Sequence, residues 1–151
     1  MTSIGLERLN TWVKAREYVI MVYREVLPLL PPEEKYGLNS QIRRAANSIP
    51  ANIAEGYGRY YYQANIQFCY NARGSLEELL SHLIISHDLR FITDEVFSKA
   101  ISTGYNLVIL LNGYISYLRK TKHGDNEQGT IKTIKEEKVI YEIEDFIDED
   151  Y

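Results

Sequence analysis

The stretch that decides the fold is residues 41–59, Gln-Ile-Arg-Arg-Ala-Ala-Asn-Ser-Ile-Pro-Ala-Asn-Ile-Ala-Glu-Gly-Tyr-Gly-Arg. At about 100° per residue, an α-helix gathers its apolar residues on one face and its polar residues in a second band about 80° wide. The second face holds short polar groups between two arginines, unlike the Lys and Glu mixture of an ordinary solvated surface. The apolar face consists of Ile42, Ala46, Ile49, Ile53 and Gly56, and the polar face of Arg44, Ser48, Asn52, Glu55 and Arg59.

Apolar residues also recur at steps of three or four on both sides of this stretch. The pattern predicts four helices, over about 10–30, 38–60, 63–89 and 93–120. Pro31-Pro32 ends the first helix, and Thr93 or Asp94 is the expected N-cap of the fourth. Four amphipathic helices with short connections predict an all-α, antiparallel up-down-up-down four-helix bundle.

Three glycines lie inside the last two predicted helices. A glycine in a helix interior costs about 1 kcal/mol relative to alanine, so its presence indicates a place where backbones approach closely. We therefore expect tight packing at Gly74, Gly104 and Gly113.

The charge divides the chain into two parts. Residues 1–123 contain 14 Lys and Arg against 11 Asp and Glu, a net charge of +3, and are predicted to form the bundle. Residues 124–151 contain 3 Lys against 10 Asp and Glu, a net charge of −7, and are predicted to form an acidic C-terminal extension, partly disordered or ordered on contact. A partner of the body is expected to be anionic, and the extension either opposes that partner or folds back onto the body.

The composition indicates the compartment of the protein and the kind of surface it has. The lone Cys69 has no intrachain disulfide partner and lies between Phe68 and Tyr70, which favours a packed, reduced thiol in a cytoplasmic protein. The longest strongly apolar run, Leu107–Leu111, is too short to span a bilayer, so no membrane partner is expected. Thirteen Tyr against four Phe favour interfaces and half-buried helix faces.

The sequence offers no set of residues that predicts catalysis. His82 and His87 are five apart, not the three or four that places two metal ligands side by side. Glu77 and Glu78 fit a solvated helix face, and Cys69 has no nearby base in the sequence. We therefore expect no enzyme, no metal and no cofactor.

The polar face of residues 41–59 has two interpretations. In the first, its residues meet the next helix in a hydrogen-bonded polar seam with Arg73, Ser75 and Glu78. In the second, guanidinium groups at Arg43, Arg44, Arg59 and Arg73 contact phosphates. The nearby cluster of Tyr57 and Tyr60–Tyr62 is equally suited to stacking bases and to forming a subunit interface.

Several motifs in this order resemble a known family. Leu9-Asn-Thr-Trp12 and Tyr36-Gly-Leu come first, followed by Gln41-Ile-Arg-Arg-Ala, Ser48-Ile-Pro-Ala-Asn-Ile-Ala-Glu-Gly and Ala72-Arg-Gly-Ser-Leu-Glu-Glu-Leu. Over about residues 6–120 the chain resembles the four-helix-bundle proteins encoded in intervening sequences of bacterial 23S ribosomal RNA genes. The resemblance implies an up-down-up-down bundle that assembles as a ring-like homopentamer and has no established enzymatic activity.

That family is similar in fold to the accessory variability determinant of diversity-generating retroelements, a pentamer that binds nucleic acid and the element's reverse transcriptase. This similarity implies contacts to RNA or polymerase by the arginines of the second helix and by Arg119, Lys120 and Lys122. The expected function is a homo-oligomeric scaffold for nucleic acid, plausibly an accessory to a retroelement reverse transcriptase and its RNA. The alternative is a protein-interaction module, in which the acidic extension recruits the partner.

Overall fold

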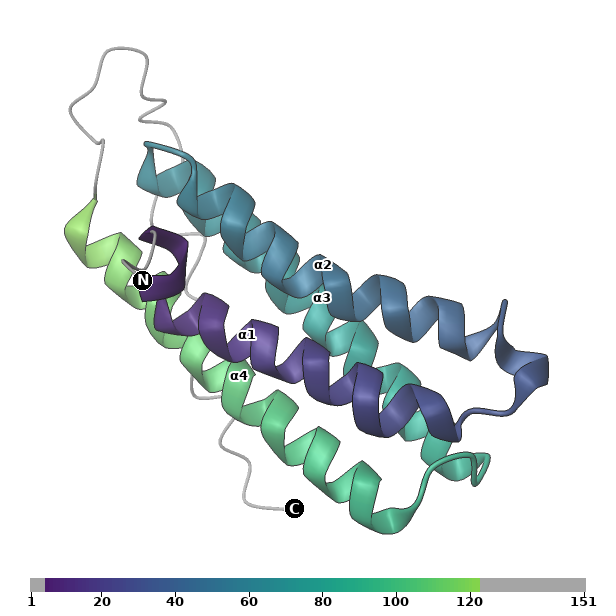
Figure 1. The fold of residues 1–151 in the computed structure, drawn as a ribbon. Coiled ribbons are helices and arrows are strands. Elements are labelled where there is room, and N and C mark those ends of the chain that lie inside the picture. Colours follow the sequence, from purple (N-terminus) through teal and green to yellow (C-terminus); the bar gives the residue numbers. More distant parts are fainter. Residues whose placement is uncertain (1–4, 123–151) are drawn as a thin grey trace.

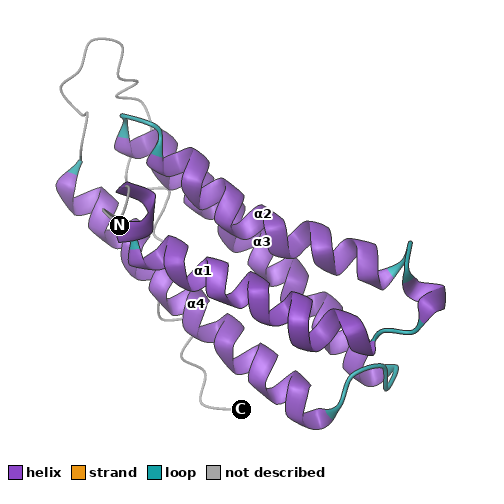
Figure 2. Ribbon diagram, in the orientation of Figure 1, coloured by secondary structure: helices purple, strands orange, loops and turns teal. Residues whose placement is uncertain are grey.

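A computed structural model describes residues 5–122 of the chain, which form a bundle of four helices lying side by side (Figure 1). Each helix runs opposite to the next, and α1 also contacts α4, so the bundle closes. The described residues contain helices and loops and no strand (Figure 2). The prediction of an all-α up-down-up-down bundle is therefore confirmed, whereas the acidic extension lies outside the described residues. The helices are α1 (Asn10–Met21), α2 (Leu38–Tyr57), α3 (Tyr62–Asp88) and α4 (Asp94–Thr121).

The first predicted helix is helical throughout but changes its winding. After α1 the chain forms a π-helical turn, η2 (Val22–Val26), and then a 3₁₀ turn, η3 (Leu27–Leu29). Pro28 lies in the 3₁₀ turn, and because it has no N–H group it cannot extend the regular hydrogen-bond pattern. The chain leaves the helix at Leu30, where ψ is 138°, directly before the two prolines.

The other helix limits are close to the predicted ones. α2 ends at Tyr57 instead of residue 60, because Gly58 and the residues after it form the turn into α3. α4 has the expected N-cap at Thr93, whose Oγ1 accepts a hydrogen bond of 3.2 Å from the Val96 N–H. The cap satisfies one of the backbone donors that the first turn of a helix leaves without a partner.

The apolar face of residues 41–59 is at the centre of the core. Its five members are all buried, together with Leu76, Leu79 and Leu83 of α3 and Leu111 of α4. Removing these side chains from water contributes most of the favourable free energy of folding. The core residues thus fix which side of α2 faces inward and leave its polar side for other contacts.

The three helix glycines differ in what surrounds them. A methyl group at Gly104 would lie 2.6 Å from Leu80 Cδ2 and 2.7 Å from Tyr18 Oη, so tight packing there is confirmed. At Gly74 and Gly113 no described atom would lie within 4 Å of such a methyl group. The prediction of close approach within the subunit is wrong for these two, since both lie on exposed parts of their helices.

One end of the bundle brings together segments that are distant in the sequence. The C-termini of α2 and α4, the N-terminus of α3 and the short helix η1 (Gly5–Arg8) all lie there (Figure 1). Up-down-up-down topology requires this arrangement, because every second helix terminus returns to the same end. Among residues 5–122, no helix has the length and hydropathy needed to cross a membrane.

Candidate nucleic-acid interface

The middle of the polar face of α2 joins it to α3. Ser48 Oγ lies 2.8 Å from Ser75 Oγ, and the Asn52 side-chain amide donates to the Ser48 carbonyl at 2.8 Å and to Ser48 Oγ at 3.0 Å. All three side chains are half-buried. We call Ser48, Asn52 and Ser75 the polar seam. The contact between the two hydroxyls joins the helices, and the Asn52 amide nitrogen is engaged with Ser48 within α2, so these atoms already have partners inside the subunit.

Arg44 lies at one end of the polar seam. Its Nη2 donates to Gln41 Oε1 at 2.7 Å and to Glu78 Oε1 at 3.2 Å, which ties α2 to α3. The Arg44 side chain is 70% exposed, and an exposed ion pair of this kind contributes only about 0–1 kcal/mol. Its neighbour Arg43 lies over the ring of Tyr23, 5.7 Å from the ring centre.

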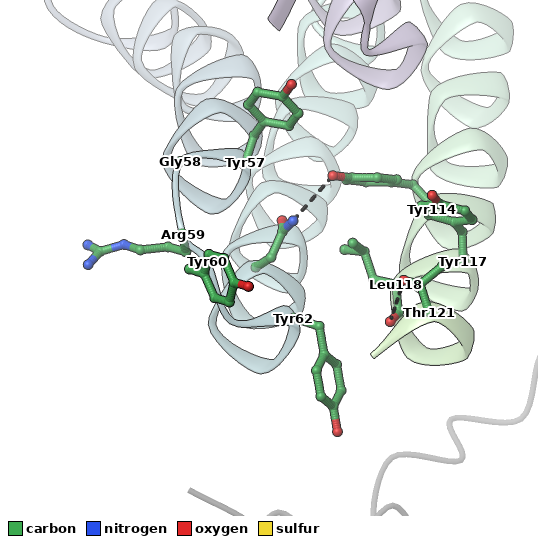
Figure 3. A pocket seen from close by; sticks show the side chains of 10 residues that line it. Tyr57, Gly58, Arg59, Tyr60, Tyr62, Tyr114, Tyr117, Leu118 and Thr121 are labelled. Atoms are coloured by element: carbon green, nitrogen blue, oxygen red, sulfur yellow. Dashed lines mark hydrogen bonds between the residues drawn. The ribbon is translucent and has the colours of Figure 1, made fainter. Parts of the chain in front are cut away.

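Glu55 and Arg59 form the other end of the polar face. Arg59 Nη2 donates to Glu55 Oε1 at 2.6 Å, as expected for residues four apart on a helix. The guanidinium also lies 5.3 Å from the centre of the Phe68 ring. Figure 3 shows this group pointing away from α4.

Arg73 does not take part in the polar seam. Its Nη1 donates to Asn112 Oδ1 on α4 at 2.9 Å, and its guanidinium lies 4.9 Å from the centre of the Tyr70 ring. Arg73 precedes Ser75 by two positions, which is about 200° around a helix and directs it to the other neighbour. Arg119 of α4 donates to the Tyr70 hydroxyl, so two arginines flank one tyrosine between α3 and α4.

The end of the bundle that carries the α2–α3 turn has a pocket of about 460 Å³ (Figure 3). One side is formed by the end of α2 and the turn, and the other by the last turns of α4. Leu118 and Thr121 add to its α4 side. We call this the tyrosine pocket, because its lining includes Tyr57, Tyr60, Tyr62, Tyr114 and Tyr117, with Asn65 between them.

The shape of the pocket depends on a close approach of α2 to α3. A methyl group at Gly56 would lie 2.7 Å from Asn65 Oδ1 and 3.0 Å from the Asn65 carbonyl oxygen, so only glycine fits. Asn65 in turn accepts a hydrogen bond of 3.6 Å from Cys69 Sγ and donates one of 3.2 Å to Tyr114 Oη. This chain of contacts holds Tyr114 in place between the two sides.

Tyr114 keeps its own hydroxyl proton. Burial raises the pKa of Tyr114, and the hydrogen bond from Asn65 lowers it by less. Since Asn65 is the donor in their contact, the Tyr114 O–H remains a donor for a group that enters the pocket. Tyr114 also lies parallel to Tyr117, with ring centres 6.4 Å apart and planes 16° apart.

Basic residues predominate at this end. The terminal turns of the helices that meet there carry five basic residues and two acidic ones, a net charge of +3, and Glu55 is paired with Arg59. Lys120 and Lys122 are exposed, and Lys122 ends α4 in a left-handed conformation with φ of 45°. The basic residues are Arg8, Arg59, Arg119, Lys120 and Lys122, and the acidic residues are Glu7 and Glu55.

The seven cations predicted to contact nucleic acid therefore do not form one surface. Arg43 and Arg44 lie on the first half of α2, and Arg73 lies between α3 and α4 with Arg119. Arg119 also belongs to the same end of the bundle as Lys120, Lys122 and Arg59. The four cations at this end share it with the tyrosine pocket, so this is the place where charge and aromatic rings coincide.

The sequence analysis identified three of the five tyrosines of the tyrosine pocket. It identified Tyr57 and Tyr60–Tyr62 but missed Tyr114 and Tyr117, which come from the far end of the chain. A usable signal existed: the two tyrosines are three apart near the end of the fourth helix, and the predicted topology places that end beside the turn between the second and third helices.

The two histidines within helix α3 occupy separate sites. His82 Nε2 lies 3.4 Å from Glu78 Oε1, and His87 Nε2 lies 2.6 Å from Asp94 Oδ1. Over residues 5–122, no group of three or more His, Cys, Asp or Glu side chains is placed to hold a metal ion.

The fold and this basic, tyrosine-lined end define a small helical-bundle protein with a candidate binding site. The 23S rRNA-intervening sequence protein family matches residues 7–113, and the chain belongs to this family. A solved structure, a protein of unknown function from the S23 ribosomal protein family of Bacteroides thetaiotaomicron, has the same fold. Its TM-score is 0.64 at 23% sequence identity, over 70% of this chain and 97% of that one. None of the curated proteins compared with the chain matches it.

Proposed function

We propose that this protein is a non-enzymatic, homo-oligomeric helical scaffold, pentameric as its family resemblance implies, that binds nucleic acid. The observation that carries the proposal is the coincidence of a net charge of +3 with a tyrosine-lined pocket at one end of the bundle. Cations bind phosphates, and aromatic rings stack on bases. The partners we propose are RNA and the reverse transcriptase of a retroelement, which the scaffold would position relative to each other.

Assembly of several copies is supported by the outer surface of α3 and α4. Ile109 is 69% exposed, and Ile84, Ile85 and Tyr105 are also exposed. Exposed large apolar side chains of this kind occur at protein interfaces, although single ones are also found on ordinary surfaces. Gly74 fits the same interpretation, because no described atom packs against it within the subunit and it would permit close approach by a second copy.

Assembly also strengthens binding to an anion. One body carries only +3, but five copies in a ring would add their fields around a common surface. Binding by counterion release would then depend steeply on salt. The acidic extension, with a net charge of −7, would compete with RNA for the same cations.

The test is an RNA-binding titration at several salt concentrations, with the mass of the same samples determined by light scattering. We expect a ring whose RNA affinity falls steeply with salt, and we expect residues 1–123 to bind more tightly than the full chain. An assembly that binds no RNA even at low salt would refute the proposal.

A second candidate function is a protein-interaction module without direct nucleic-acid binding. It is favoured by the intrachain contacts of Arg44, Arg59 and Arg73, each of which already has a polar partner. In this case the acidic extension recruits the partner protein. Deleting residues 124–151 would then abolish the complex with that partner, whereas in the first case it would strengthen RNA binding.

A further inference from the structure

We propose that the tyrosine pocket binds an unpaired nucleobase of RNA, while the basic residues at the end of α4 hold the adjoining phosphates. This inference rests on the proposed function and deepens it, because it names the part of the RNA that is recognised. It makes the site selective for single-stranded RNA, whose bases are free to leave their neighbours.

The dimensions and lining of the pocket suit a base. Its volume of about 460 Å³ is within the range of pockets that enclose small organic ligands, about 300–1,000 Å³. Tyr117 and Tyr60 are 59% and 51% exposed, and they lie on opposite sides of the pocket. Every base has a π-face, and stacking on such rings is worth about 1–3 kcal/mol per base.

The polar groups in the pocket complement the edges of a base. Tyr114 offers a hydroxyl donor, because its oxygen already accepts a hydrogen bond from Asn65. The remaining tyrosine hydroxyls can donate and accept. A purely apolar ligand would leave these groups without partners, which is costly when they are removed from water. The lining therefore favours an aromatic ligand with polar edges over a hydrocarbon.

The charges beside the pocket indicate a ligand that carries phosphate. Leu118 and Thr121 line the pocket, and Arg119, Lys120 and Lys122 are interleaved with them in the sequence. Lys120 and Lys122 flank Thr121, so we expect their long side chains to lie near a phosphate attached to a bound nucleoside, whereas the Arg119 guanidinium is engaged with Tyr70. A free aromatic metabolite without phosphate would make no use of them.

A double-stranded RNA does not satisfy this arrangement. In a duplex the bases are paired and stacked inside the helix, so their flat faces are covered and only base edges, sugars and phosphates are accessible. The cations could bind a duplex, but the tyrosines would gain no stacking contact. The structure therefore separates two contributions: charge, which any RNA can use, and stacking, which only an unpaired base can use.

The experiment compares three labelled RNAs on the full-length protein at the same salt concentration. The first is a single-stranded 12-mer, the second is that 12-mer paired with its complement, and the third is a 12-mer with the same phosphates but no bases. We expect the first to bind about tenfold more tightly than the other two. Equal binding of all three RNAs would overturn the inference and leave the proposed function intact.

Two variants of Tyr117 test whether the pocket causes the difference in affinity between the three RNAs. Tyr117→Ala should lose the preference for intact bases, and Tyr117→Phe should retain it because it keeps the ring. Tyr36→Ala is the control, since Tyr36 is an 85% exposed tyrosine that lies outside the pocket and outside the exposed apolar residues of α3 and α4. If Tyr117→Ala keeps the full preference for intact bases, the inference is wrong.

A mononucleotide titration tests the pocket even if no long RNA binds. Uridine or adenosine monophosphate is added to the full-length protein, and the NMR signals of Tyr114 and Tyr117 are followed. Saturable shifts at these residues but not at Tyr36 would support the inference. Signals that do not move with nucleotide but change in a Phe146→Ala variant would show that the acidic extension occupies the pocket and would overturn it.

Discussion

Tyr18 on α1 and Gly104 on α4 fit against each other with no room for an added carbon atom. A methyl group at Gly104 would lie 2.7 Å from Tyr18 Oη, which donates a hydrogen bond of 2.8 Å to the Ala100 carbonyl. Tyr18 is 1% exposed, so its ring cannot move outward without breaking that bond. The contact between α1 and α4 is therefore set by the absence of a side chain at Gly104.

Gly104→Ala should destabilise the protein. Overpacking a core costs about 1–3 kcal/mol, which exceeds the gain of about 1 kcal/mol from replacing a helix glycine by alanine. Thermal unfolding followed by circular dichroism should show a lower Tm. The control is Gly113→Ala on the same helix, where nothing described lies within 4 Å of the new methyl group. That variant should raise the Tm, and a lower Tm in both would contradict this account.

The polar seam gives a second prediction. Ser48→Ala and Ser75→Ala should each destabilise the fold by about 1 kcal/mol, since each leaves one half-buried hydroxyl without its partner. The double variant should cost less than the sum of the two, because they share one hydrogen bond of 2.8 Å. Urea unfolding of all four proteins measures this coupling. Strict additivity would mean that the two hydroxyls do not interact in solution.

A cation beside the tyrosine pocket and a cation on the first half of α2 should differ in their effect on RNA binding. Lys120→Ala should weaken binding to all RNAs and reduce the slope of log affinity against log salt by about one. Arg44→Ala should leave the slope unchanged, because Arg44 is far from the tyrosine pocket and is already engaged by Glu78. Filter binding over a range of salt concentrations measures both. A larger effect at Arg44 would move the RNA site to the side of α2.

Much of the fold could be predicted from the sequence, because helical periodicity reports directly which residues are buried. The five apolar residues of 41–59 are all in the core. The glycines show where this reasoning fails: Gly74 and Gly104 look alike in the sequence, but only one faces a neighbouring helix. A glycine inside a helix costs stability and therefore indicates a close contact, but the sequence does not say whether that contact is within one subunit or with another.

The candidate site was predicted less completely, for a related reason. Ser48 and Glu55 lie on one helix, so their common face could be read from spacing alone. The seam interpretation is wrong for Arg73, because two positions on α3 turn a side chain from α2 to α4. Tyr117 lines the tyrosine pocket because the bundle places the end of α4 beside the α2–α3 turn, and local sequence spacing does not reveal this arrangement.

The last prediction concerns alkaline pH. Burial raises the pKa of Cys69 from its ordinary value of 9.0 to about 12, and burial also raises the pKa of Tyr18 well above its usual range. The folded state therefore holds these protons more tightly than the unfolded state. Below about pH 9 both groups are protonated in the folded and the unfolded state, and the free energy of unfolding does not depend on them. As the pH rises toward 12 they ionise first in the unfolded state, which lowers the free energy of unfolding by at most about 1.4 kcal/mol per pH unit and group.

Urea unfolding between pH 8 and pH 11 measures this loss. The stability of the parent protein should fall across the range, and Cys69→Ala and Tyr18→Phe should each fall less steeply, whatever their stability at pH 8. Tyr36→Phe is the control, because Tyr36 is 85% exposed and its environment changes little on unfolding. The same burial predicts that Cys69 reacts with a thiol reagent at pH 8 only after unfolding. Rapid reaction of the native thiol would show that the chain of contacts from Cys69 through Asn65 to Tyr114 opens in solution.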